Sequence, residues 1–207
     1  RRHTRYWRDW SSDVCSSDLE AITTYDGNRD DSHTDPPHTI AIECKNVTSL
    51  ATHEAGMARR SARLSLIQEH SAPWSKYREI KERLRTEYQR QLVAGPTEPH
   101  NPNNAGVGAI ARSCDTLFEF TPVTPSFAKM REAGRAIHLG FGLGKRGRIV
   151  SFFNLYGHSG GASDPQKAKC TSLILQACMQ EMLHFSDLPH FLMGDLNGNF
   201  TSFERSE

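Results

Sequence analysis

Three apolar segments of the chain each lead directly into a polar side chain that can do chemistry. The segments are RLSLIQ (63–68), followed by Glu69; RIVSFFNLY (148–156), ending in Tyr156; and HFLMG (190–194), followed by Asp195. Short apolar runs of this kind are typical of buried strands. The loops that follow strands in layered α/β folds collect ligand-binding groups. The pattern therefore predicts a sheet-based domain with a functional site at its strand ends.

The rest of the chain from residue 38 alternates further strands with helices. We predict additional strands at 40–44, 107–112, 117–122 and 136–141, helices at 52–62, 74–92 and 164–183, and turns at 95–106 and 144–147. Apolar residues in steps of three and four predict the amphipathic helix from Trp74 to Leu92. Asp164 followed by Pro165 is typical of a helix start. Because helices connect the strands, the order of elements favours a layered α/β domain.

Charge and composition exclude several classes of protein. Lys and Arg together number 25 and Asp and Glu 24, which gives a net charge of +1. The chain is therefore not a strongly basic protein that binds nucleic acid through its overall charge alone. No apolar run approaches the roughly 20 residues that span a bilayer, so we predict no membrane segment. The cysteines lack a CxxC pair and are expected to be reduced thiols; they lie at positions 15, 44, 114, 170 and 178.

The first 37 residues differ in character from the rest of the chain. Residues 9–19 (DWSSDVCSSDL) match, codon by codon, the translation of a common short-read sequencing adapter. We therefore interpret residues 1–19 as an artefact and exclude them from the fold. Residues 20–37 are polar, rich in Asp and Thr, and are expected to form a flexible lead-in. The domain is expected over residues 38–207.

Two motifs that suggest phosphate binding have plainer explanations. The GFGLGK segment (140–145) lacks a phosphate-loop pattern, because Leu139 replaces the first required glycine and Arg146 replaces Ser or Thr. A hairpin turn accounts for it better. The basic residues of the 74–92 helix could contact a phosphate backbone. Glu79, Glu82 and Glu87 are interleaved with them, which favours a solvent face with salt bridges.

Four motifs together resemble those of the endonuclease/exonuclease/phosphatase superfamily. They are KNVTSL (45–50), LSLIQEH (64–70), FFNLYGH (152–158) and HFLMGDLNGNF (190–200). This superfamily includes deoxyribonuclease I-like nucleases, abasic-site endonucleases and the endonuclease domains of non-LTR retrotransposons. The resemblance covers about residues 38–200, and the NLYGHSGG stretch with its following helix favours the retroelement type.

The resemblance implies a two-sheet α/β sandwich that hydrolyses phosphodiesters with Mg²⁺, or alternatively Mn²⁺. It implies a nucleic acid substrate, DNA rather than RNA, and an intracellular location, nuclear for a retroelement endonuclease. Glu69 would bind the metal, and Asp195 would orient or deprotonate the attacking water. Asn197 and Tyr156 would donate hydrogen bonds to a phosphate oxygen, and Asn46 would steady the metal site or the catalytic carboxylate. Outside the resemblance, Asn46 is a turn residue and Tyr156 a core aromatic with a solvated tip.

The sequence departs from the superfamily pattern at its end. Superfamily members continue past the GDLN motif into further strands and a catalytic Asp–His segment, whereas this sequence stops at Glu207. We therefore expect a sandwich that is incomplete at the C-terminus, a truncated fragment with impaired activity. Two alternatives stay open. One is a hydrolase of the same fold that acts on RNA or on another phosphoester as a phosphatase, and the other is a non-catalytic remnant or binding module.

Overall fold

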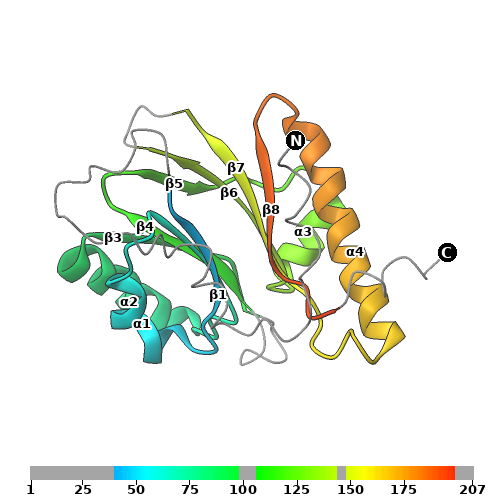
Figure 1. Cartoon of the computed structure of the whole chain (residues 1–207), viewed down its shortest axis with the longest axis horizontal. Coiled ribbons are helices and arrows are strands. Elements are labelled where there is room, and N and C mark those ends of the chain that lie inside the picture. The colour runs from blue at the N-terminus through cyan, green and yellow to red at the C-terminus, as the bar shows by residue number, and fades with distance from the viewer. Residues whose placement is uncertain (1–39, 98–105, 144–147, 199–207) are drawn as a thin grey trace, which may run out of the picture.

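The chain folds into two four-stranded sheets that pack face to face, with helices on both outer sides (Figure 1). The computed structural model describes residues 40–97, 106–143 and 148–198. The elements are β1 (Ile42–Asn46), α1 (Leu50–Ala58), β2 (Leu64–Gln68), α2 (Trp74–Tyr88), β3 (Arg90–Ala94), β4 (Val107–Arg112), β5 (Thr116–Glu119), α3 (Pro125–Glu132), β6 (Ala136–Gly142), β7 (Val150–Tyr156), α4 (Pro165–Met182), the 3-10 helix η3 (Leu183–Phe185) and β8 (His190–Asp195). The predicted two-sheet α/β sandwich is confirmed.

Each sheet has one parallel strand pair at its edge. The first sheet has the order β1-β2-β4-β3 and the second the order β5-β6-β7-β8. The parallel pairs are β1 with β2, where Asn46 lies opposite Gln68, and β7 with β8, where Tyr156 lies opposite Asp195. Because parallel strands end at the same edge of a sheet, each pair delivers two strand ends to one place.

Three apolar layers hold the sandwich together. The central layer lies between the sheets and includes Leu66, Ile137 and Phe152. A second layer packs α1 and α2 on the first sheet, and a third packs α3 and α4 on the second sheet. All five residues of β2 are buried, as expected for a strand covered on both faces. Fully burying each large apolar side chain contributes roughly 1.5–3 kcal/mol to stability.

The layer under α3 and η3 contains a buried histidine among aromatic rings. His138 stacks on Phe153 at a centroid distance of 4.0 Å and on Phe120 at 4.3 Å. Its Nε2 lies 2.7 Å from the Ser151 hydroxyl oxygen. Burial lowers the pKa of His138 to about 3, and the neighbouring His190 adds to the effect. The imidazole is therefore neutral in the folded protein at physiological pH.

Two helices differ from the sequence prediction. The helix predicted over 74–92 is wrong at its end: α2 stops at Tyr88, where Gln89 takes a positive φ of 52°, and the following residues form β3. Leu92 is buried in either arrangement, so its apolar character could not distinguish them. The helix α3 was not predicted, although Thr124 and Pro125 form a helix-start signal. The Thr124 side chain accepts a hydrogen bond from the Phe127 amide, and buried Glu181 of α4 accepts bonds from the Val123 and Thr124 amides.

The remaining predictions fall partly outside the described residues. The expected strands near 40–44, 107–112, 117–122 and 136–141 and the helix from Asp164 are confirmed, with shifts of a few residues at their ends. The helix predicted over 52–62 is present as α1, which begins and ends earlier, at Leu50 and Ala58. Residues 1–37, the turn at 144–147 and most of the 95–106 loop lie outside the described ranges. Cys44, Cys114, Cys170 and Cys178 are free thiols. In the described part of the chain, no helix has the length and apolar character needed to cross a membrane.

Candidate active site at the strand ends

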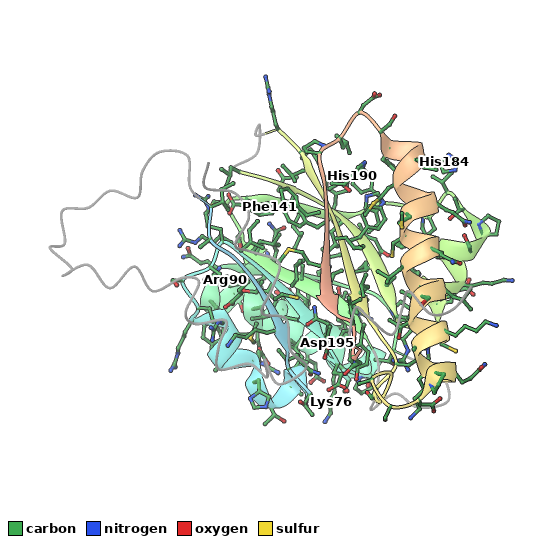
Figure 2. All side chains as sticks on the ribbon, turned by 45° about the vertical axis from the view of Figure 1, so that its right-hand side comes forward. Lys76, Arg90, Phe141, His184, His190 and Asp195 are labelled. Atoms are coloured by element: carbon green, nitrogen blue, oxygen red, sulfur yellow. The ribbon has the colours of Figure 1, made fainter. Side chains whose placement is uncertain are left out.

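The ends of four strands meet at one edge of the sandwich. Strand β8 of the second sheet lies against β1 and β2 of the first sheet, and β7 lies against β2. Figure 2 shows Asp195 at one end of β8 and His190 at the other. The three residues that the apolar segments deliver, Glu69, Tyr156 and Asp195, are therefore brought to this edge from two different sheets.

Glu69 and Tyr156 are in direct contact across the two sheets. The Tyr156 hydroxyl donates a hydrogen bond to Oε1 of Glu69 and lies 3.0 Å from the Ser159 hydroxyl oxygen. Glu69 directly follows β2 and has a positive φ of 51°. The Tyr156 ring is buried, with 1% of its surface exposed. Tyr156 therefore combines two features expected from the sequence: its ring is part of the core, and its hydroxyl group lies at the candidate site.

The Tyr156 phenol stays protonated over the whole physiological range. Burial raises the pKa of Tyr156 to about 12, and the hydrogen bond to Glu69 and the charge of Asp195 act in the same direction. Arg135 places its guanidinium carbon 5.2 Å from the centre of the Tyr156 ring. A protonated phenol is a hydrogen-bond donor, which is the state needed to contact an anionic oxygen.

Asp195 and Asn197 form a compact turn that is fixed to the end of β7. Oδ1 of Asp195 accepts a hydrogen bond of 2.9 Å from the Asn197 amide, and Asn197 has a positive φ of 50°. The Asn197 side-chain amide donates to the Gly157 carbonyl at 3.1 Å, and the Gly157 amide donates to the Asp195 carbonyl at 2.7 Å. The Asn197 side chain, expected to donate to phosphate, therefore donates one hydrogen to the protein. Its NH₂ group carries a second hydrogen.

Gly194 allows β8 to approach β7 directly before Asp195. Its φ is +147°, and a Cβ at this position would overlap the Leu155 carbonyl oxygen. We expect Gly194→Ala to destabilise the protein by about 1–3 kcal/mol, because an L-residue is strained in this conformation. Urea unfolding followed by circular dichroism measures the change. Gly56→Ala in α1 is the matched control, since nothing lies within 4 Å of its added Cβ, and it should not lower stability. Equal stabilities of the two variants would contradict the prediction.

Asn46 lies next to the site but is not joined to it by a described contact. It lies opposite Gln68 in the β1–β2 pair, and Gln68 directly precedes Glu69 in the chain. Its Oδ1 accepts a hydrogen bond of 3.1 Å from the Thr48 amide, which is the turn role that the sequence allowed. Within residues 40–97, 106–143 and 148–198, no hydrogen bond links Asn46 to Glu69 or Asp195. Its expected role toward the metal site stays a prediction.

The oxygen donors at this edge suit a hard cation. Glu69 and Asp195 supply two carboxylates, and both charges act on the same phenol. Burial chiefly, with a contribution from Asp195, raises the pKa of the Cys44 thiol to about 12, so this thiol is not a thiolate ligand. The described residues contain no group of three or more His, Cys, Asp or Glu arranged around a common point. This donor set fits Mg²⁺, which uses one or two protein carboxylates and keeps several waters, and does not fit a closed zinc site.

The structure adds residues that the sequence analysis did not select. Ser159 contacts the Tyr156 phenol, and Arg135 covers its ring. Asn154 is fully buried and bonds to the strand that carries Glu69. The only sequence signal for Asn154 was an amide inside the apolar run SFFNLY, because a buried polar residue in a strand needs partners.

The two mixed four-stranded sheets and the helices on their outer sides match the deoxyribonuclease I-like fold. The chain shares this fold with the endonuclease/exonuclease/phosphatase superfamily, so the resemblance of its motifs is confirmed at the level of fold.

Three solved structures illustrate the likeness. The 3′ phosphatase NExo from Neisseria, bound to a product DNA hairpin, has a TM-score of 0.51 and 18% identity over 77% of this chain. A family protein from Bacteroides thetaiotaomicron has a TM-score of 0.53 and 13% identity, covering 79% of this chain and 67% of its own. The endonuclease domain of TRAS1, a telomere-specific non-LTR retrotransposon, has a TM-score of 0.50 and 12% identity, covering 79% of this chain and 61% of its own.

At these identities the likeness concerns the fold. The chain spans 58% of the length of the Neisseria structure. No protein-family model matches the chain, and no curated protein sequence matches it significantly.

Proposed function

We propose that the chain is a divalent-metal-dependent phosphodiester hydrolase that acts on DNA, of the retroelement endonuclease type. The observation that carries the proposal is the meeting of Glu69 with the Tyr156 phenol beside Asp195 at the strand ends. Two structural neighbours support a DNA substrate, because one was solved with a DNA hairpin and another is a retrotransposon endonuclease domain. An intracellular and nuclear location follows from this proposal and stays a prediction.

The site residues take complementary roles in the proposed reaction. Glu69, with Asp195 nearby, would hold Mg²⁺, which when bound neutralises charge on the phosphate and the leaving oxygen. Asp195 orients a water and accepts its proton as the water attacks phosphorus. Tyr156 would turn its single phenolic hydrogen from Glu69 to a non-bridging phosphate oxygen when the substrate binds, and the second amide hydrogen of Asn197 is available for the same purpose. Both side chains are held in place by the fold before the substrate arrives, so the phenolic hydrogen changes its partner without a movement of the backbone.

The proposal is tested by nicking of supercoiled plasmid DNA in the presence of Mg²⁺, with EDTA and Mn²⁺ as companion reactions. Nicking that needs the metal supports the proposal, and its absence with both metals overturns it. We expect Glu69→Gln to raise the half-saturating Mg²⁺ concentration by about 10- to 100-fold, because a neutral amide replaces the carboxylate ligand. Glu79→Gln on the exposed face of α2 is the matched control and should leave the metal titration unchanged. An unchanged titration for Glu69→Gln would remove Glu69 from the metal site.

A phosphatase of the same fold is the second candidate, because the Neisseria neighbour is a 3′ phosphatase. The two candidates differ in the bond that is hydrolysed. A hairpin oligonucleotide ending in a 3′ phosphate distinguishes them: a phosphatase releases inorganic phosphate and leaves the chain length unchanged, whereas an endonuclease shortens the strand.

A further inference from the structure

A buried asparagine in β7 joins the two sheets directly behind the candidate site. Asn154 has no exposed surface. Its Oδ1 accepts a hydrogen bond of 2.6 Å from the Gln68 side chain. Its Nδ2 donates to the carbonyls of Ile67 at 2.9 Å and of Gly108 at 2.8 Å. The asparagine of one sheet therefore binds two neighbouring strands of the other sheet.

These contacts fix the position of β7 against the β2–β4 pair. Ile67 and Gly108 lie directly opposite each other in that pair, so one amide group spans both strands. A buried amide is costly unless its hydrogen bonds are made, and a satisfied polar network inside a core accepts a single geometry. Apolar contacts alone, such as those of Phe152 elsewhere in the central layer, are not directional. The network therefore selects one placement of the two sheets.

Both ends of this network adjoin the residues of the site. Gln68 directly precedes Glu69, and Asn154 lies two positions before Tyr156, on the same face of β7. The hydrogen bond between Tyr156 and Glu69 joins the same two strands one step further along. A shift of β7 against β2 would separate the phenol from the carboxylate, and the Asn154–Gln68 bond resists that shift.

We propose that Asn154 and Gln68 are positioning residues that set the contact between Glu69 and Tyr156, and through it the geometry of the phosphate site. The effect of Asn154 and Gln68 on catalysis rests on the function proposed above, whereas their effect on the Tyr156 phenol does not. Neither amide reaches the substrate, because both side chains are buried between the sheets.

The test uses Gln68→Met, which removes the two hydrogen bonds that the Gln68 amide donates, to Asn154 and to the Cys44 sulfur, and keeps the bonds of Asn154 to the two carbonyls. The ¹³Cζ resonance of Tyr156 at neutral pH, assigned by its loss in Tyr156→Phe, reports the hydrogen bond of the phenol. We expect this resonance to shift, and kcat on a short DNA duplex to fall by about 10- to 100-fold, because small misplacements of reacting groups cost this much. KM should stay within about twofold, since the groups that bind the substrate are retained.

Two further variants separate positioning from general stability. Ser151→Ala, also buried in β7, removes the bond to His138 at the other end of the strand. It is expected to lower the melting temperature without moving the Tyr156 resonance or kcat. The exchanged pair Gln68→Asn with Asn154→Gln keeps both amides and is expected to restore the resonance and at least a tenth of the wild-type kcat.

The outcomes decide between the two proposals. An unshifted Tyr156 resonance in folded Gln68→Met overturns the positioning role, and so does an equal shift in Ser151→Ala. If the resonance shifts as expected but the wild-type protein cleaves no phosphodiester, the positioning role stands and the proposed function fails. If Gln68→Met does not fold, the exchanged pair is the deciding variant. A shifted Tyr156 resonance in the folded exchanged pair also overturns the proposal.

Discussion

Replacing Asp195 with asparagine is expected to lower kcat for DNA cleavage by roughly 10²- to 10⁴-fold, the range of general base catalysis. Asparagine has nearly the same shape but cannot accept a proton from water. Its Oδ1 can still accept the hydrogen bond of the Asn197 amide, so the turn after β8 should be preserved. The measurement is the single-turnover rate on a labelled duplex at saturating Mg²⁺, with circular dichroism to confirm the fold.

Asp164→Asn is the matched control for this experiment. Asp164 caps α4 by accepting hydrogen bonds from the Gln166 and Lys167 amides. Asparagine caps a helix about as well as aspartate does, so this variant should keep both activity and stability. A rate for Asp195→Asn within threefold of that for Asp164→Asn would show that Asp195 is not the base.

Acidification below pH 6.5 is expected to destabilise the fold steeply, because two histidines are buried in their neutral form. Burial lowers the pKa of His70 to about 4 and that of His138 to about 3. In the unfolded chain both titrate near pH 6.5, so the unfolded state binds more protons as the pH falls from 6.5 toward the folded values. The free energy of unfolding is therefore highest above pH 6.5 and falls as the pH decreases below that value. At pH 5 the two histidines together lower it by about 4 kcal/mol.

Urea unfolding at pH 7 and at pH 5 measures this loss. His138→Phe removes one of the two groups and keeps an aromatic ring between Phe153 and Phe120, so it should reduce the difference between the two pH values by about half. His184→Gln, on the exposed surface of η3, should leave the difference unchanged. A wild-type difference below about 1 kcal/mol would show that the two histidines are accessible to protons in the folded state.

The sequence predicted the elements whose signals are local. The strands that end at Glu69, Tyr156 and Asp195 are short apolar runs, and the start of α4 follows from Asp164 and Pro165. The end of α2 could not be predicted, because Leu92 satisfies a helix and a strand equally well and the pairing of β3 with β4 decides between them. Tertiary context thus overrides periodicity at this boundary.

The site was predictable as a set of strand ends but not as a geometry. Glu69 and Tyr156 were selected for the chemistry of their side chains, while their mutual contact depends on the register between two sheets. Asn154 and Gln68, which fix that register, lie inside predicted strands and received no role there, because their side chains become partners only when β2 and β7 are brought together. Residues of this kind are found by asking which buried amides have partners.

Each sheet is built from one continuous half of the chain, β1–β4 in the first and β5–β8 in the second. The functional groups lie on both sides of this division, with Glu69 in the first half and Tyr156 and Asp195 in the second. Neither half holds all three groups, so the candidate site exists only where the two sheets pack against each other. Under the proposed function, neither of two fragments divided between β4 and β5 is expected to hydrolyse DNA alone, because each lacks part of the site.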